Sequence, residues 1–178
     1  IEKQVQIYSK IVFRSNRGLA GNGAVPVLAE AVDSFKKLLP VVLSLRNPSL
    51  KPRHWVEIET VIGDGFTAGQ SYTLGQLLDL NVEAKQEEIE IVASTAVQEA
   101  VLDELFNTKV LDVWKNLEFI VKPFKDSKDV FILGSVEDIV IALDDSLVTL
   151  NTILGSRFCK PIRAAVEKWQ RDLILVSD

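Results

Sequence analysis

Methionine is absent from the 178 residues, and histidine and cysteine occur once each, as His54 and Cys159. A single cysteine cannot form a disulfide within the chain, so the sequence fits a reducing compartment. A zinc site needs several His or Cys ligands in tetrahedral geometry, and one of each is too few. The sequence therefore predicts no metal site and no cofactor.

The chain also lacks concentrated basic charge, because 20 Lys and Arg oppose 25 Asp and Glu and leave a net charge of −5. Phosphate binding needs clustered cations, so nucleic acid is not an expected partner. The most apolar short runs, 38–43 and 130–133, fall far below the roughly 20 residues of a membrane span, and no membrane is expected either. With no secretory signal and no initiator Met, the chain is interpreted as a soluble piece of a longer protein.

No set of residues converges on catalysis. The glycines at 18, 21 and 23 lack the Gly-Lys-Ser/Thr ending of a phosphate loop, so a plain loop is expected there. The adjacent acids Asp144-Asp145 and Glu87-Glu88 point to different sides of their predicted helices, unlike a carboxylate pair that shares a site. A catalytic pair of Cys159 and His54 stays formally open, although nothing places the two together. We therefore predict no catalytic residue and no enzyme activity in this chain.

The sequence does contain helical periodicity along most of its length. Glycine and asparagine predict a loop over 14–23, Pro26 suits the first turn of a helix, and Pro40 should kink or end that helix. The expected helices are 1–13, the segment from Pro26 to Pro40, 41–46, 52–62, 74–80, 83–106, 110–117, 136–154 and 161–178.

Several residues mark expected helix ends or an expected core. Thr73 and Ser135 suit N-caps, and Gly63 suits the residue that ends a helix. A break in the long helix is expected near 107–108. The last two helices are predicted from apolar residues at helical spacing, namely Val136, Ile139, Val140, Leu143, Leu147, Leu150 and Leu154, and then, on one side of the last helix, Ile162, Ala165, Val166, Trp169 and Leu173. The tryptophans, at 55, 114 and 169, are expected in core or interface packing.

Alternating apolar residues on both sides of the charged segment 125–129 predict a β-hairpin, with Pro123 limiting its first arm to an edge strand. The predicted fold class is mainly α, an antiparallel helical bundle or arch fragment with one small β-hairpin near 118–133. We expect 1–178 to form a single fragment, with possible sub-bundles 1–80 and 81–178.

Two stretches resemble a known family. Residues 39–55, LPVVLSLRNPSLKPRHW, resemble the LP…LRNPxLxxRHW signature in the linker region of dynein heavy chains, and 73–80, TLGQLLDL, resemble the segment that follows it there. The similarity continues in order and spacing through 132–139, 156–158 and 167–169. Pro52 replaces a charged residue common in that family, and 14–24 have no counterpart.

The resemblance implies a mechanical function. In dyneins the linker is a helical arch across a ring of AAA+ modules, and it bends as the ring hydrolyses ATP. The implied partner is the AAA+ ring of the same heavy chain, and the parent motor gives only an indirect link to microtubules. Residues 143–149 and 156–158 look more like axonemal than cytoplasmic heavy chains, which implies a cytoskeletal location in the axoneme of a cilium or flagellum. The alternative from the residues alone is a stand-alone helical adaptor that binds other proteins.

Five residues of the signature are candidate site residues: Arg46, Asn47, Arg53, His54 and Trp55. Either they lock the turn against a neighbouring helix, or part of the motif contacts the AAA+ ring. A lever also needs a place to yield, and the candidates are the loop 63–69 and the junction 155–161.

Overall fold

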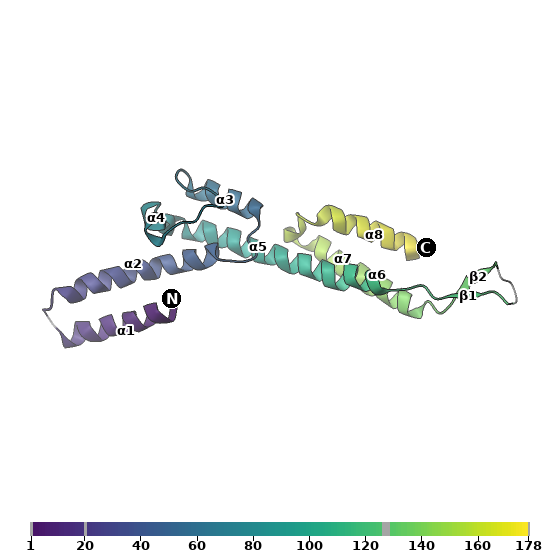
Figure 1. Ribbon diagram of the computed structural model, residues 1–178, viewed down its shortest axis with the longest axis horizontal. Helices are drawn as coiled ribbons and strands as arrows, with labels where there is room; N and C mark the ends of the chain where they lie inside the picture. The colour runs from purple at the N-terminus through teal and green to yellow at the C-terminus, as the bar shows by residue number, and fades with distance from the viewer. Residues whose placement is uncertain (1, 20, 126–128, 178) are drawn as a thin grey trace. The chain divides into compact units, whose positions relative to one another are not determined.

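The computed structural model describes residues 2–19, 21–125 and 129–177. The fold is mainly α with one antiparallel hairpin, as the sequence predicted (Figure 1). Its elements in chain order are α1 (Glu2–Gly18), α2 (Ala24–Leu45), α3 (Pro52–Ile62), α4 (Leu74–Asp79), the 3-10 turn η1 (Val82–Lys85), α5 (Gln86–Phe106), the π-helical segment η2 (Asn107–Leu111), α6 (Asp112–Asn116), β1 (Val121–Pro123), β2 (Phe131–Leu133), α7 (Glu137–Gly155), the 3-10 turn η3 (Arg157–Cys159) and α8 (Arg163–Ser177).

The chain divides into two compact units, 1–96 and 97–178, and the boundary falls within α5. Each unit has its own apolar core. The separate sub-bundles 1–80 and 81–178 stay a prediction.

In the first unit, α1 and α2 form a helical hairpin, and α3, α4 and the first part of α5 pack beside the second half of α2 (Figure 1). The described residues Glu2–Gly18 of α1 include none that is buried. The core of this unit instead consists of Leu38, Val41, Ile58, Phe66, Leu77, Val82, Ile89 and Val92.

In the second unit, α8 folds back along α7, and both pack against the end of α5 and the segment η2 (Figure 1). The core consists of Phe106, Val110, Leu143, Leu150, Ile153, Cys159, Val166 and Leu173. The buried residues of α7 thus recur at helical spacing, which is why this amphipathic sequence folds as a helix here.

The predicted end of the first helix is wrong, and of the two outcomes expected at Pro40, a kink or an end, the end does not occur. α1 continues through 14–17 to Gly18, because those polar residues tolerate a helix whose apolar stripe packs on α2. α2 runs through Pro40 to Leu45. A proline removes only one N–H from the ladder, and the buried neighbours Leu38 and Val41 hold both sides of it in the core.

Other helix ends also differ from the prediction. The expected break near 107–108 is instead the continuous π-helical segment η2. Ser135 is not the N-cap of α7, because Val136 takes that position and its carbonyl accepts the Val140 N–H at 2.9 Å. The last helix begins at Arg163 rather than at 161.

Only part of each apolar stripe that predicted the last two helices is buried. Val136, Val140 and Ala165 are exposed, whereas Ile139, Leu143, Leu150, Val166 and Leu173 are buried. Buried Ile153 was not among the residues of these stripes.

Several local predictions are confirmed. Pro26 lies in the first turn of α2, and α3 spans 52–62. Gly63 ends α3 with a φ of +85°, a conformation that glycine adopts without strain. Thr73 caps α4, since its Oγ1 accepts the Gln76 N–H at 3.3 Å. The hairpin pairs β1 with β2 near 118–133, and the central part of the expected charged tip, 126–128, lies outside the described residues.

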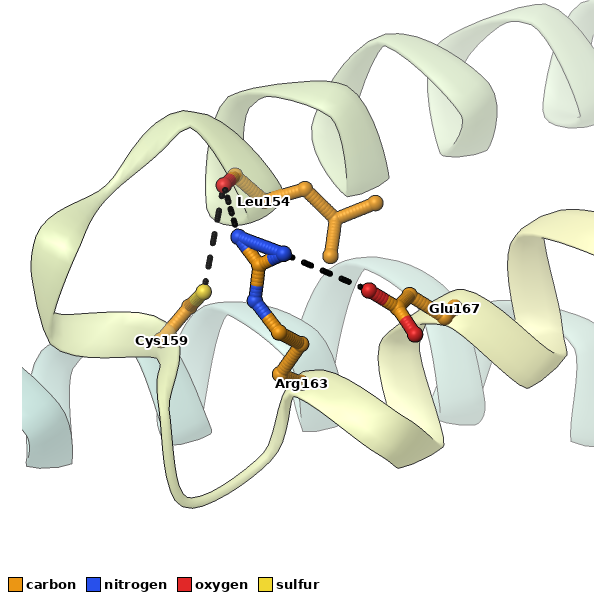
Figure 2. Close-up of polar contacts among 4 residues, drawn as sticks. All are labelled: Leu154, Cys159, Arg163 and Glu167. Carbon is orange, nitrogen blue, oxygen red and sulfur yellow. Dashed lines mark hydrogen bonds and ion pairs between the residues drawn. The ribbon is translucent and has the colours of Figure 1, made fainter.

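The junction between α7 and α8 is held by polar contacts around one backbone carbonyl (Figure 2). The Leu154 carbonyl accepts from Nη2 of Arg163 at 3.3 Å and from the thiol of Cys159 at 3.8 Å. Arg163 also pairs with Glu167 through Nη1 at 3.3 Å. These contacts satisfy a carbonyl at the end of α7 that has no partner within the helix.

Among the described residues, no helix combines the length and the apolar character needed to cross a bilayer.

Candidate functional site

The turn between α2 and α3 carries the candidate site residues, and Asn47 fixes its geometry. Its Oδ1 accepts the Ser49 N–H at 3.0 Å, which closes a local Asx turn. Its Nδ2 donates to the Ala93 carbonyl of α5 at 3.2 Å. One side chain therefore both shapes the turn and ties it to α5.

His54 lies in the first turn of α3 and is 1% exposed. The imidazole Nδ1 accepts the backbone N–H of Lys51 at 3.0 Å, and the backbone N–H of His54 donates to the Lys51 carbonyl at 2.9 Å. The imidazole thus acts on the N-cap backbone in the way a Glu or Gln does in a capping box. This geometry gives His54 a structural task inside the first unit.

Trp55 belongs to a stack of three aromatic rings. Its ring lies 6.4 Å from that of Phe66 at an interplanar angle of 17°, and Phe66 lies 4.7 Å from Tyr72 at 14°. Such offset stacks add to the stabilisation from buried area. The stack holds the loop after α3 against the helix that begins at Pro52.

A pocket of about 240 Å³ opens beside this stack. Its walls are apolar except for Arg46 and Gln70, and they comprise Val42, Leu45, Arg46, Trp55, Phe66, Gln70, Tyr72 and Leu77. Arg46 is exposed and permanently charged. The pocket suits a ligand or partner in which an apolar side chain fills the apolar walls and a neighbouring acidic group pairs with Arg46.

The five candidate residues thus occupy different environments. Arg46 and Trp55 line the same pocket, His54 is in the interior, and Asn47 is half-buried against α5. Arg53 is exposed on α3. The structure therefore brings an exposed cation and an aromatic ring together, beside two residues that hold the turn.

The described residues contain no group of three or more His, Cys, Asp or Glu placed to hold a metal ion. His54 lies in the first unit and Cys159 in the core of the second. Both acidic pairs, 87–88 and 144–145, are exposed.

Sequence reasoning missed Phe66 and Tyr72 as packing partners of Trp55, because both lie in the connection between the predicted helices 52–62 and 74–80. The signal was available, since two aromatic residues in a polar loop near a tryptophan indicate packing rather than a solvated connection. It also missed the Ala93 carbonyl, which no sequence pattern marks as a partner of Asn47.

The sequence of the whole chain, residues 1–178, matches the family model described as dynein heavy chain, N-terminal region 2. The chain belongs to this dynein heavy chain family. The resemblance in the turn that holds the candidate site thus extends over the complete chain.

Among its relatives, dynein axonemal heavy chain 6 of Homo sapiens is 42% identical over 175 residues, which is 98% of this chain and 4% of that protein. Dynein axonemal heavy chain 10 of Homo sapiens is 27% identical over 180 residues, or 100% of this chain and 4% of that protein. The dynein-1-alpha heavy chain of the flagellar inner arm I1 complex of Chlamydomonas reinhardtii is 28% identical over 155 residues, 85% of this chain and 3% of that protein. This dynein heavy chain region thus corresponds to a few per cent of the length of these relatives.

Proposed function

We propose that this chain is a mechanical linker element of a dynein motor, which bends across the AAA+ ring of the same heavy chain and converts ATP hydrolysis into movement along microtubules. Catalysis belongs to the ring, and the chain reaches microtubules only through the parent motor. The observation that carries the proposal is the family match over 1–178. The axonemal and flagellar relatives support a location in the axoneme of a cilium or flagellum.

The packing of the chain is compatible with this function. Force transmission needs stiff elements, and closely packed interiors deform little. The first unit has such an interior, where Asn47 and the aromatic stack on Trp55 hold the connection from α2 to α3. The yielding segment belongs to the same proposal, with 63–69 and 155–161 as the candidates.

A flexible insertion tests the lever. Ten Gly and Ser residues placed between Ser156 and Arg157 of the full-length heavy chain add a compliant joint to a candidate hinge. We expect slower microtubule gliding with an unchanged rate of ATP hydrolysis, because the fuel is used elsewhere in the polypeptide. Gliding at the normal speed would contradict the lever.

The contact with the ring is proposed to use Arg46 and Arg53 at the surface, beside Trp55. Arg53→Glu reverses one of these charges, and Lys168→Glu is the matched control because Lys168 is an exposed cation on α8. Slower gliding of the Arg53 variant with an unchanged melting temperature supports a contact. A lowered melting temperature instead assigns Arg53 to locking the turn, and equal gliding of both variants removes it from the contact.

One observation favours the alternative of a stand-alone helical adaptor. A groove of about 530 Å³ between α1 and α2 is lined almost wholly by apolar residues, among them Val5, Tyr8, Leu28, Val32 and Phe35. Grooves of this kind accept the apolar face of a partner helix. The full-length parent distinguishes the two functions, because a motor carries a phosphate-binding loop downstream of this region and an adaptor does not.

A further inference from the structure

The β-hairpin exposes apolar side chains on both of its faces. Every described residue from Glu118 to Leu133 is exposed. The apolar ones are each 42% to 60% exposed, namely Phe119, Ile120, Val121, Phe124, Val130, Phe131, Ile132 and Leu133. A hairpin of two strands is marginally stable on its own in water, so this element gains stability from whatever covers or extends it.

Two hydrogen bonds between the strands show which backbone groups of the hairpin point outward. The Phe124 N–H donates to the Val130 carbonyl at 2.8 Å, and the Gly134 N–H donates to the Ile120 carbonyl at 2.6 Å. In an antiparallel pair, hydrogen-bonded and non-hydrogen-bonded residue pairs alternate. The backbone groups of the central pair, Lys122 and Ile132, therefore face the partner strand. The backbone groups of the pairs on either side of it point away from the partner strand.

The pairs that face away are Val121–Leu133 and Pro123–Phe131. On the outer edge of β2, both Phe131 and Leu133 present a backbone N–H and a carbonyl. On the outer edge of β1, Pro123 has no N–H to present. The two edges are thus unequal, and the edge of β2 has the complete set of donors and acceptors.

The sequence protects one edge and leaves the other open. Natural edge strands carry proline or charged residues that prevent pairing with another chain, and β1 has both, as Lys122 and Pro123. Residues 130–136, VFILGSV, contain no charge and no proline. An unprotected edge of this composition is expected where a further strand pairs with it.

We propose that the outer edge of β2 binds an extended, uncharged segment of the same heavy chain, from outside residues 1–178, as a third strand. We expect the segment to be uncharged because its side chains would lie beside β2, which has no charged residue to pair with them. Burying an unpaired charge is costly. Its backbone bonds to the free groups of Phe131 and Leu133.

The small area of the β2 edge favours a segment of the same polypeptide over a separate protein or a second copy. An edge of three residues offers far less than the roughly 1,200 Å² that a stable interface between separate proteins buries. A tethered segment binds at a high effective concentration and needs much less area. The relatives have ample chain for such a segment, since the present residues correspond to 4% of their length.

Hydrogen exchange of the full-length heavy chain, resolved to single residues, tests the pairing. We expect the Phe131 and Leu133 amides to exchange at least tenfold more slowly than the Val121 amide, which points away from β2 on the other edge. Leu133→Pro removes one outward donor and should speed exchange at Phe131 and in the partner segment. Val121→Pro is the matched control, because it removes the opposite outward donor and should leave both rates unchanged.

A photoreactive benzoylphenylalanine in place of Phe131 identifies the occupant. Cross-links to a segment of the same chain outside 1–178 support the proposal. Cross-links only to another protein, or only to a second copy in a mixture of isotope-labelled and unlabelled chains, overturn it. Exchange at Phe131 and Leu133 as fast as at Val121 overturns it as well, whatever the cross-links show. None of these outcomes depends on gliding speed, so the lever and the strand pairing can fail separately.

Discussion

At the scale of single residues, each buried polar side chain depends on a hydrogen bond with one neighbour for its contribution to stability. His54 and Ser146 are each 1% exposed, and each accepts a hydrogen bond, from the Lys51 N–H and from Nε1 of Trp114. A buried donor that loses its acceptor keeps its desolvation penalty without compensation. Substitution of either residue is therefore expected to lower the stability of the fold.

His54→Ala should lower the free energy of unfolding by about 1–3 kcal/mol, because the Lys51 N–H at the start of α3 loses its acceptor. Urea unfolding gives the value. Glu57→Ala on the exposed side of the same helix is the control, with a change within about 0.5 kcal/mol. Equal values for the two variants would show that the imidazole does not cap the helix.

Trp114 and Ser146 should be coupled, since Nε1 of Trp114 donates to Oγ of Ser146 at 3.0 Å. We expect Ser146→Ala to cost about 1–3 kcal/mol, because it leaves the indole N–H without its acceptor. In a Trp114→Phe background the same change should cost clearly less. A double-mutant cycle measures the difference, and strictly additive effects would exclude the coupling.

At the scale of elements, the degree of burial of each side chain in α7 determines how much it contributes to the free energy of unfolding. Leu150 is 0% exposed, Leu147 is half-buried against the same core, and Val148 is 65% exposed. The cost of truncating a leucine grows with the cavity that it leaves. Truncating these three side chains of one helix should therefore give a graded series of losses in stability.

Leu150→Ala should cost about 2–5 kcal/mol, and Leu147→Ala less than Leu150→Ala. Val148→Ala should stay within about 0.5 kcal/mol, as a surface change does. Thermal melts of the three variants rank them directly. A cost of Leu147→Ala below about 0.5 kcal/mol would place that side chain at the surface instead.

Gly134 closes the base of the hairpin, and a side chain there would be crowded against Ile120. A Cβ there would lie 3.0 Å from Cγ2 and 3.2 Å from the carbonyl oxygen of Ile120. Gly134→Val should therefore weaken the bond from its N–H to that carbonyl and speed amide exchange throughout β1 and β2. Gly75→Ala, where a Cβ meets nothing within 4 Å, should leave the hairpin rates unchanged.

At the scale of the whole molecule, the two separate cores predict that a destabilising substitution in one unit affects the opening of that unit and not of the other. Ile58 lies in the core of the first unit and Leu150 in that of the second. Exchange rates report local and subglobal opening, which follows such cooperative units.

Ile58→Ala should speed amide exchange in α2, α3 and α4 and leave α7 and α8 nearly unchanged, while Leu150→Ala should do the reverse. Hydrogen exchange of the two variants checks this. Equal acceleration in all five helices would indicate one cooperative unit rather than two.

Much of the local structure could be predicted because it depends on residues close together in the chain. Pro52, Thr73 and Gly63 act on the backbone within a few positions, and the alternation around 119–132 likewise predicts a hairpin. The helix does not end at Pro40, where buried Leu38 and Val41 hold both sides of the proline in the core, and the N-cap of α7 lies one residue beyond Ser135, at Val136. Likewise, the sequence named the five candidate site residues, but not their different environments.

The sequence by itself determined the helical class, the hairpin and the family, because periodicity and motif order are properties of the chain alone. Only the tertiary structure decided that His54 is a buried cap, that Asn47 reaches Ala93, and that Arg46 and Trp55 share a pocket. The bond from Asn47 to Ala93 spans 46 residues of sequence, so no local pattern marks it. The burial of His54 and the shared pocket follow from how side chains of several elements fill a common core.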